Sequence, residues 1–198
     1  DNQPINFSVP TGNFGDVYAG YLAKKLGLPI NKLIVATNQN DILHRAISKG
    51  KYEAEHVSET ISPSMDIQIA SNFERLIYDL NNHDSSQTLD DMKNIKQNGK
   101  YTIDDEKLKK INQDFLSARM SEQETLDVIK NIYEKFNMVL DPHTAIGYGA
   151  FDKHDLKGNN IVLATAHPCK FPDAILKAIN LKSDLPDELK FILDEKEN

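Results

Sequence analysis

The sequence predicts an α/β fold, in which a mainly parallel sheet with crossover helices carries a helical insertion. Short runs rich in β-branched residues alternate with amphipathic helical patterns, which is typical of strands joined by crossover helices. A long polar stretch over residues 84–112 interrupts this alternation. The 198 residues are enough for one sizeable hydrophobic core, or for one core with a helical appendage.

The first part of the chain predicts one βαβα unit followed by a longer helical region. The expected elements are, in order, a strand over residues 5–9, a helix over 17–26, a strand over 32–36 and a helix over 41–49. Asp16 suits the cap of the first helix, and Gly27 and Gly50 stand where the two helices should end. An apolar stripe with helical spacing then runs from Met65 to Leu80 and is interpreted as core.

The middle of the chain, residues 81–140, predicts a helical insertion or subdomain. Residues 84–112 are rich in Asp, Lys, Asn and Gln, as expected of solvated helices or a mobile insertion. Ser121 and Glu124 have the spacing of a capping box, and apolar residues follow at helical spacing up to Phe136.

Residues 141–198 predict a return to the sheet. A strand is expected over residues 160–165, and a helix that begins at Pro168 or Pro172 is expected to follow. The segment 185–193 closes the chain. The sequence therefore predicts three segments. Residues 1–80 form an α/β unit, residues 81–140 form the helical insertion or subdomain, and residues 141–198 complete the sheet.

Composition narrows the classes of partner. Thirty acidic against twenty-three basic residues give a net charge of −7, which argues against a nucleic-acid partner. A single cysteine, Cys169, excludes an internal disulfide and fits a reducing compartment. The longest apolar runs are too short to span a membrane, and His143 and His167 lack the spacing of metal ligands. We expect a cytoplasmic protein without a metal site.

The turn between the first strand and the first helix has the composition of an anion-binding loop. Gly12 and Gly15 flank Asn13 and Phe14. Glycine permits unusual backbone conformations and close approach of a ligand, and the helix that follows directs its free N–H groups and positive dipole end into the loop. Phosphate is the natural ligand. Two glycines three residues apart are a weak signal by themselves, because many strand-to-helix turns need glycine for conformational reasons.

Six blocks of sequence strengthen this interpretation. They are VPTGNFGD at residues 9–16, ATNQND at 36–41, SPSMDI at 62–67, SNFER at 71–75, DPHTA at 141–145 and TAHP at 165–168. In this order they resemble the threonine synthase family, whose members use pyridoxal phosphate (PLP) and have the tryptophan-synthase-β-like fold, fold type II. The resemblance covers most of the chain except residues 82–120, and it implies that residues 1–80 and 141–198 belong to the large, PLP-binding domain.

The resemblance also implies roles for individual residues in binding the cofactor. Gly12, Asn13, Phe14 and Gly15 would hold its phosphate, mostly through backbone N–H groups. Thr165 would face the pyridine nitrogen, where a neutral hydroxyl leaves that nitrogen largely unprotonated. Structural alternatives are a hydrophobic plug beneath the loop for Phe14 and an ordinary strand-end threonine for Thr165.

Four further residues in these blocks are candidates for contact with the substrate, namely Asn38, Ser64, Asp66 and Arg75. Arg75 is a candidate phosphate clamp, but Asp79 lies four residues further on, so an ion pair within one helix is the alternative. For Asp66 the alternative is a carboxylate that caps or orients a loop.

The same resemblance implies that a catalytic residue lies elsewhere. In the family, the Schiff-base lysine belongs to an earlier part of the polypeptide and stands between Phe and Asp, and no Phe-Lys-Asp occurs here. Lys170-Phe171 has the wrong order, and Lys170 is interpreted as a surface residue. We expect the chain to be the C-terminal portion of a longer enzyme, inactive without its N-terminal portion.

The reaction implied is the conversion of O-phospho-L-homoserine and water to L-threonine and phosphate by a PLP-dependent β,γ-replacement. A phospholyase similar to threonine synthase would use the same loop, eliminate phosphate without adding water and release a keto acid. A non-catalytic phosphate-binding module is the third hypothesis, and it would not discriminate between inorganic phosphate and PLP.

Overall fold

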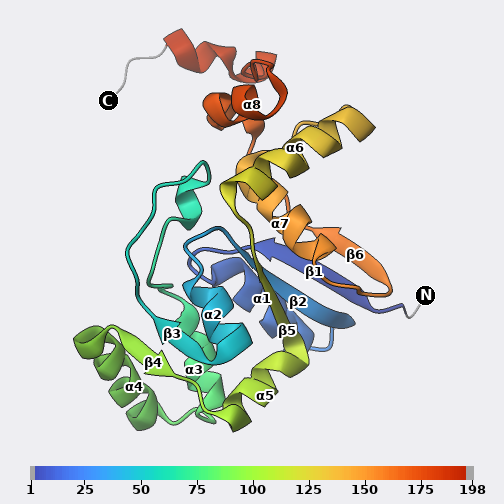
Figure 1. The fold of residues 1–198 in the computed structure, drawn as a ribbon. Coiled ribbons are helices and arrows are strands. Elements are labelled where there is room, and N and C mark those ends of the chain that lie inside the picture. Colours follow the sequence, from blue (N-terminus) through green and yellow to red (C-terminus); the bar gives the residue numbers. More distant parts are fainter. Residues whose placement is uncertain (1–2, 195–198) are drawn as a thin grey trace.

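A parallel four-stranded sheet forms the centre of the computed structural model, which describes residues 3–194 (Figure 1). The strands are β1 (Ile5–Pro10), β2 (Ile30–Thr37), β5 (Phe115–Arg119) and β6 (Asn159–Val162), in the spatial order β5-β2-β1-β6. Each neighbouring pair runs parallel. The predicted α/β class with a mainly parallel sheet is confirmed.

The apolar run of β2 is buried on both faces of the sheet. Leu33 and Val35 belong to the core on one face, whereas Ile34 and Ala36 belong to the core on the other. Because successive side chains of a strand point to opposite faces, a strand covered by helices on both sides needs an unbroken apolar sequence. The sequence of β2 therefore required two helical layers.

The first layer consists of helices from the N-terminal and middle parts of the chain. It contains α1 (Gly15–Lys25), α2 (Ile42–Lys49), α3 (Phe73–Leu80) and α5 (Asp105–Asp114) (Figure 1). Helices α1, α2 and α5 contact the sheet, and α3 packs on α1. Phe73, Leu76 and Ile77 of α3 are buried, so the apolar stripe is core, as predicted.

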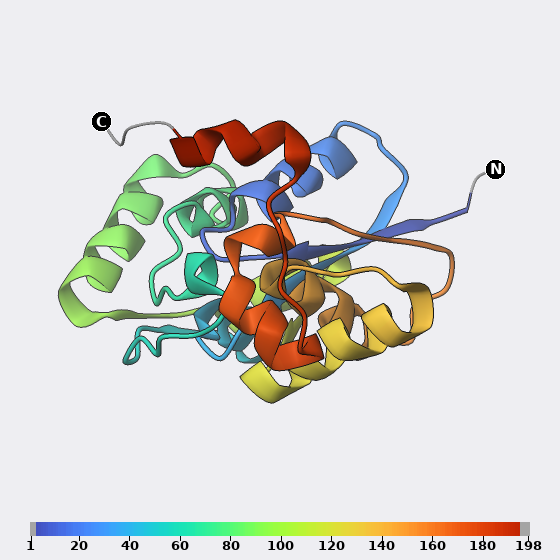
Figure 2. The ribbon, with the colours of Figure 1, turned by 90° about the horizontal axis from the view of Figure 1, so that it is seen from above.

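The second layer covers the opposite face. Helix α7 (Pro142–Asp152) contacts all four strands, α6 (Glu122–Phe136) packs on α7, and α8 (Pro172–Ile179) lies beside α6 (Figure 2). Gly147 allows α7 to approach β1, since a Cβ there would lie 3.0 Å from the Pro10 side chain. The hydroxyl of Ser8 also donates a hydrogen bond to the Gly147 carbonyl oxygen at 2.6 Å. The end of β1, which leads into the anion-binding loop, is thereby fixed.

The middle segment is not wholly helical, contrary to the prediction for residues 81–140. It contains α4 (Ser85–Asn98), and β4 (Lys100–Thr102), which pairs antiparallel with β3 (Lys51–Glu53). It also supplies β5, which was not predicted because only Phe115 and Leu116 begin it and polar residues surround it. The division at residues 81 and 141 stays a prediction, but the middle segment contributes an edge strand of the main sheet.

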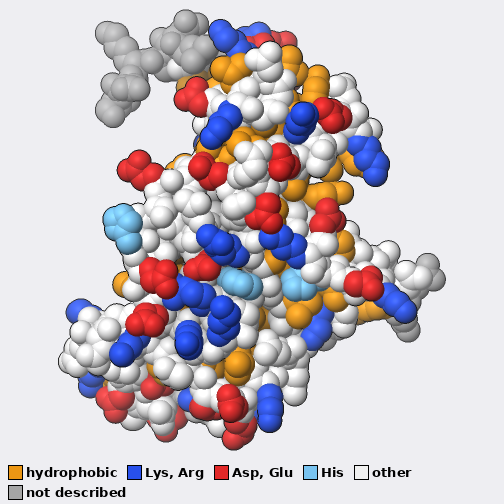
Figure 3. Space-filling model, viewed as in Figure 1, with side chains coloured by type: hydrophobic (Ala, Val, Ile, Leu, Met, Phe, Trp, Pro, Cys, Tyr) orange, Lys and Arg blue, Asp and Glu red, His pale blue; other side chains and the backbone are white. Residues whose placement is uncertain are grey.

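One face of the molecule shows how the charged side chains are distributed. Basic and acidic side chains are interspersed on the face seen in Figure 3. Across residues 3–194, we find no helix with the length and apolar character needed to span a bilayer.

Candidate functional site

The loop between β1 and α1 presents backbone donors that have no acceptor among residues 3–194. Helix α1 begins at Gly15, and Phe14 is its N-cap. Within the described residues, no protein acceptor pairs with the N–H groups of Gly12, Asn13 and Phe14. The first N–H groups of a helix also lack intrahelical acceptors, and the helix dipole adds positive charge there. This arrangement suits an anion such as phosphate.

Phe14, rather than a glycine, adopts the unusual backbone conformation of the loop. Its φ is 68°, whereas Gly12 and Gly15 do not have positive φ. The conformational role predicted for the two glycines is therefore wrong. Burial holds Phe14 in place, because its side chain is fully buried and packs edge-on against Phe73, with 5.1 Å between ring centroids. The interpretation of Phe14 as a plug beneath the loop is confirmed.

Glycine is required at position 12 because a larger residue would collide with a neighbouring segment. A Cβ atom on Gly12 would lie 2.8 Å from the carbonyl oxygen of Ser64, which belongs to the short 3-10 helix η1 (Pro63–Met65). A Cβ on Gly15 would make only an ordinary contact, 3.5 Å from the side-chain nitrogen of Asn72. The two glycines of the motif thus have different roles, and only Gly12 permits the close approach of η1.

A cavity of about 170 Å³ brings together residues from distant parts of the sequence. Its lining comprises Pro10, Gly12, Asp16, Ser64, Met65, His143, Thr165, Ala166, Lys170 and Phe171. A second hollow of about 180 Å³ is formed by the loop itself, from Pro10 to Val17. Gly12 and Thr165, predicted to bind opposite ends of one ligand, therefore border the same space.

A buried carboxylate lies behind this cavity. Asp141 is the N-cap of α7, and its side chain is 1% exposed. Its Oδ1 accepts hydrogen bonds from the His143 backbone N–H at 2.9 Å and the His143 ring Nδ1 at 3.1 Å, and its Oδ2 accepts one from the Thr144 hydroxyl. Burial alone would raise the pKa of Asp141, but the hydrogen bonds from His143 and Thr144 outweigh it and lower the pKa.

The two residues bound to Asp141 each hold a part of the cavity wall. Nε2 of His143 accepts a hydrogen bond from the Ser64 backbone N–H at 3.3 Å. The hydroxyl oxygen of Thr144 accepts one from the Thr165 backbone N–H at 3.2 Å. His143 also packs against Phe171, with 4.9 Å between ring centroids. Both histidine nitrogens are engaged in structural hydrogen bonds, as predicted for His143.

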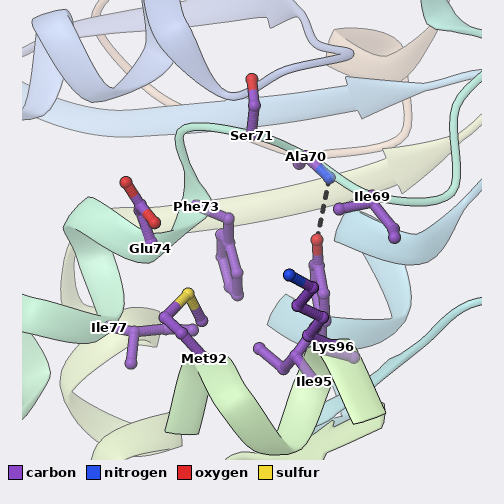
Figure 4. A pocket seen from close by; sticks show the side chains of 10 residues that line it. Ile69, Ala70, Ser71, Phe73, Glu74, Ile77, Met92, Ile95 and Lys96 are labelled. Carbon is purple, nitrogen blue, oxygen red and sulfur yellow. Dashed lines mark hydrogen bonds between the residues drawn. The ribbon is translucent and has the colours of Figure 1, made fainter. Parts of the chain in front are cut away.

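The cavity between α3 and α4 has a different character. It has a volume of about 310 Å³, and apolar side chains that include Phe73, Ile77 and Ile95 form much of its lining (Figure 4). The Ala70 N–H donates a hydrogen bond to the Tyr52 hydroxyl at 2.8 Å. With its apolar floor, this cavity is not built for phosphate.

Comparisons with known proteins find similarity to threonine synthases. Residues 144–198 match a family model described as threonine synthase, C-terminal. Threonine synthase of Pseudomonas aeruginosa is 41% identical over 99% of this chain and 42% of that protein, and the Saccharomyces cerevisiae enzyme is 44% identical over 96% of this chain and 42% of its own length. A crystal structure of PLP-bound threonine synthase from Brucella melitensis superimposes with a TM-score of 0.95 and 45% identity, over 98% of this chain and 42% of that one.

Over nearly its whole length, the chain is similar to the C-terminal part of threonine synthases. It spans about 42% of the length of these relatives, and the matching family model describes their C-terminal part. The resemblance carried by the six sequence blocks is therefore confirmed.

Thr165 lies outside the strand that was predicted to contain it. Strand β6 ends at Val162, so the expected strand over residues 160–165 was too long. A segment outside the helices and strands leads from β6 to Thr165, whose backbone N–H donates a hydrogen bond to the Thr144 hydroxyl oxygen. The strand-end interpretation is replaced by that of a loop threonine exposed at the cavity.

Asn38 and Asp66 hydrogen-bond to each other and to the loop that precedes η1. Oδ1 of Asp66 accepts hydrogen bonds from Asn38 at 2.8 Å, from Asn40 at 2.9 Å and from the Thr60 hydroxyl at 2.7 Å. Its Oδ2 accepts one from the Thr60 backbone N–H at 2.8 Å. These contacts support the interpretation of Asp66 as a residue that orients a loop.

Arg75 lies away from the cavity that contains Gly12 and Thr165. It is exposed on α3 and lines a separate groove with Tyr18 and Tyr78. Among the residues that the structure describes, it forms no ion pair with Asp79, so the predicted pair within one helix is wrong. Asp79 instead accepts a hydrogen bond from the Tyr18 hydroxyl at 3.2 Å and binds the His83 ring at 2.9 Å.

Two residues, one that lines the cavity and one behind it, were not predicted to contribute to the site. Lys170 ends the 3-10 helix η2 (Pro168–Lys170) and lines the cavity beside Thr165, although it was interpreted only as a surface residue. Its position two residues after the TAHP block was the available signal. Asp141 was recognised only as part of a sequence block. Its neighbours His143 and Thr144 hydrogen-bond to Ser64 and Thr165, and the sequence does not show that these residues lie close together in the fold.

Proposed function

We propose that this chain supplies the phosphate cradle and one wall of the active site of a PLP-dependent threonine synthase. The complete enzyme would convert O-phospho-L-homoserine and water to L-threonine and phosphate, in threonine biosynthesis. The observation that carries the proposal is the cavity bordered by Gly12 and Thr165, with unpaired loop N–H groups at one end. The similarity of the chain to the C-terminal part of threonine synthases supports PLP as the ligand of this cavity.

The residues of the loop fit a phosphate group. The N–H groups of Gly12, Asn13 and Phe14 have no protein acceptor among residues 3–194, and they stand at the positive end of α1. The backbone at position 12 lies so close to Ser64 that only glycine fits there. The side chain of Asn13 is exposed and offers a further amide donor. We assign the cofactor phosphate to these groups and to Gly15, as in the PLP-binding large domain of fold type II enzymes.

The opposite side of the cavity suits the ring of the cofactor and an anionic substrate. The Thr165 hydroxyl would face the pyridine nitrogen, and Lys170 brings a positive charge to the same cavity. When bound, PLP supplies an electron sink for removal of protons from substrate carbon atoms. The residues of this chain orient the cofactor and the substrate, and such positioning is a major part of the catalytic effect.

The candidate substrate residues divide by position. Ser64 lines the cavity and remains a candidate for direct contact. Asn38 and Asp66 would act through the loop that they hold, because their polar atoms are engaged with each other and with Thr60. Arg75 would reach a substrate only if another part of the polypeptide brought the substrate toward α3.

The covalent step requires a residue outside this chain. We infer that the Schiff-base lysine lies in the N-terminal portion of the same polypeptide, which is the principal partner of the chain, and that the chain alone is inactive. The single Cys169 is consistent with a reducing, cytoplasmic location.

The test is an assay of the complete gene product with PLP and O-phospho-L-homoserine. Formation of L-threonine and phosphate in equal amounts is the expected result. Release of a keto acid instead of threonine would assign the protein to the phospholyases. If inorganic phosphate and PLP compete with equal affinity and no product forms, the protein is a phosphate-binding module.

A charge-matched pair of variants links the activity to the loop. Gly12→Asp should abolish PLP binding, because it places a carboxylate and a side chain against Ser64 and the cradle. Gln97→Glu adds the same charge on the exposed face of α4 and should leave binding unchanged. Retained binding in Gly12→Asp would remove this loop from the site.

A further inference from the structure

We propose that Asp141 is a positioning residue that couples the two walls of the cofactor cavity, one through His143 to Ser64 and the other through Thr144 to Thr165. This inference rests on the proposed function, since it concerns how the same site is held in shape. It assigns a role to three buried residues, none of which is expected to touch the reacting atoms.

The directions of the hydrogen bonds are fixed by chemistry. A backbone N–H can only donate, so the bond from Ser64 requires Nε2 of His143 to be unprotonated. In the neutral ring, Nδ1 then carries the proton and donates it to Asp141. Likewise, Thr165 donates to the Thr144 oxygen, whose hydroxyl proton is directed at Asp141. Both chains of hydrogen bonds end on the carboxylate of Asp141, which accepts one hydrogen bond from the His143 ring and one from the Thr144 hydroxyl.

Helix capping alone does not account for this arrangement. An N-cap needs one side-chain oxygen to accept from the first N–H groups of the helix, and Ser, Thr or Asn provides it as well as Asp. In Asp141, Oδ1 accepts from the backbone N–H groups of His143 and Thr144, while Oδ2 accepts from the Thr144 hydroxyl. A second acceptor oxygen and a negative charge are what only an acidic side chain adds.

Burial makes these bonds effective. Asp141, His143 and Thr144 are all less than 9% exposed, so water does not replace a lost partner at low cost. The residues that they hold, Ser64 and Thr165, are exposed at the cavity. The buried group therefore fixes the backbone of two cavity residues, Ser64 in η1 and Thr165 in the segment that follows β6.

The test compares isosteric variants of the complete gene product. Thr144→Val removes the hydroxyl and keeps the shape, whereas Thr144→Ser keeps the hydroxyl. The matched control is Thr125→Val, because Thr125 is also buried and donates its hydroxyl to the Ser121 carbonyl oxygen at 2.8 Å, on α6. His143→Asn retains a donor toward Asp141 and loses the acceptor for the Ser64 N–H. PLP affinity, the absorption spectrum of bound PLP and the unfolding temperature of the cofactor-free protein are measured for each.

We expect Thr144→Val and His143→Asn each to weaken PLP binding by roughly 5- to 10-fold, as befits loss of one buried hydrogen bond. Thr144→Val should also shift the absorption maximum of bound PLP, because Thr165 loses its fixed position, and Thr144→Ser should restore both properties. Thr125→Val should lower the unfolding temperature without changing affinity or spectrum.

Three results would overturn the inference. Equal effects of Thr144→Val and Thr125→Val on PLP affinity and spectrum would show that Thr144 acts only through stability. An effect of Thr144→Val with none of His143→Asn would exclude coupling of the two walls. Failure of the wild-type protein to bind PLP would instead overturn the proposed function, and with it the role of Asp141.

Discussion

Gly12 faces the carbonyl oxygen of Ser64 so closely that a Cβ atom on Gly12 would lie 2.8 Å from it. This contact joins the anion-binding loop to η1, which forms another part of the same cavity. The backbone of Gly12 does not need positive φ, so the glycine is required by its neighbour and not by its conformation.

Gly12→Ala should therefore destabilise the protein, whereas Gly15→Ala should not. The alanine methyl group at position 12 would displace η1 or the loop, because backbone atoms on both sides resist movement. At position 15 the methyl group would make an ordinary contact at 3.5 Å. Thermal unfolding without PLP should show a decrease of several degrees for Gly12→Ala only, and equal unfolding temperatures for the two variants would refute the steric argument.

Phe14→Ala should cost about 3–5 kcal/mol of stability, the usual range for loss of a buried phenylalanine. The Phe14 ring is fully buried between Phe73 and Phe115, and alanine would leave a cavity under the loop while keeping its left-handed backbone. Phe136→Ala is the control, because that ring is 54% exposed, and should cost about 0.5 kcal/mol or less.

A double-mutant cycle tests the edge-on contact itself. The coupling between Phe14→Ala and Phe73→Ala should be about 0.5–1.5 kcal/mol, as expected of an aromatic pair with this geometry. Additive effects of the two substitutions would mean that the rings fill space without a specific interaction.

Glu124→Gln should lower stability at neutral pH and have less effect in acid. The hydrogen bond from Lys153, followed by that from the Ser121 backbone, lowers the pKa of Glu124 from 4.5 to about 2. Since the folded-state pKa is depressed, the stabilising contribution is complete above pH 4.5 and disappears as the pH falls toward 2. Urea unfolding should give a larger difference between wild type and variant at pH 7 than at pH 3.

Glu134→Gln provides the control for that experiment. Glu134 lies on the same helix and is 61% exposed, 3.9 Å from the Lys130 ammonium. Exposed pairs contribute little, so this variant should match wild type at both pH values. A difference between wild type and Glu124→Gln that is independent of pH would contradict the assignment to the ionised carboxylate.

Asp66→Asn should separate a loop-orienting role from direct contact with substrate. An asparagine oxygen can take the place of Oδ1, which accepts from Asn38 and Asn40, but the amide nitrogen cannot accept the hydrogen bond that Oδ2 accepts from the Thr60 backbone N–H. We therefore expect a loss of about 1–3 kcal/mol. Asp90→Asn, at an exposed position of α4, should have no effect. If Asp66→Asn raises KM while unfolding is unchanged, Asp66 binds substrate.

Local signals in the sequence predicted much of the fold. The apolar run of β2 gave a strand buried on both faces, and Ser121 and Glu124 form the predicted capping box. Both depend on residues close together in the chain. Strand β5 was missed because its place in the sheet depends on pairing with β2, which is distant in the sequence. The Thr37 hydroxyl of β2, for example, donates a hydrogen bond to the carbonyl oxygen of Ala118, 81 residues further along the chain.

The candidate site shows the same limit. The loop from Gly12 to Gly15 was found from its composition and from its place before a helix. That Phe14 would take the left-handed conformation was not predictable, because its burial against Phe73 compensates for the strained backbone. The contacts of Asp141 likewise join residues that only the folded chain brings together.

The central claim is that the phosphate of PLP lies on the loop that begins α1. The most direct test is a high-resolution crystal structure of the complete gene product with PLP bound. We expect the phosphate oxygens within hydrogen-bonding distance of the N–H groups of Gly12, Asn13 and Phe14, and the pyridine nitrogen beside the Thr165 hydroxyl. A PLP phosphate held elsewhere, with these three N–H groups bound only to water, would contradict the account.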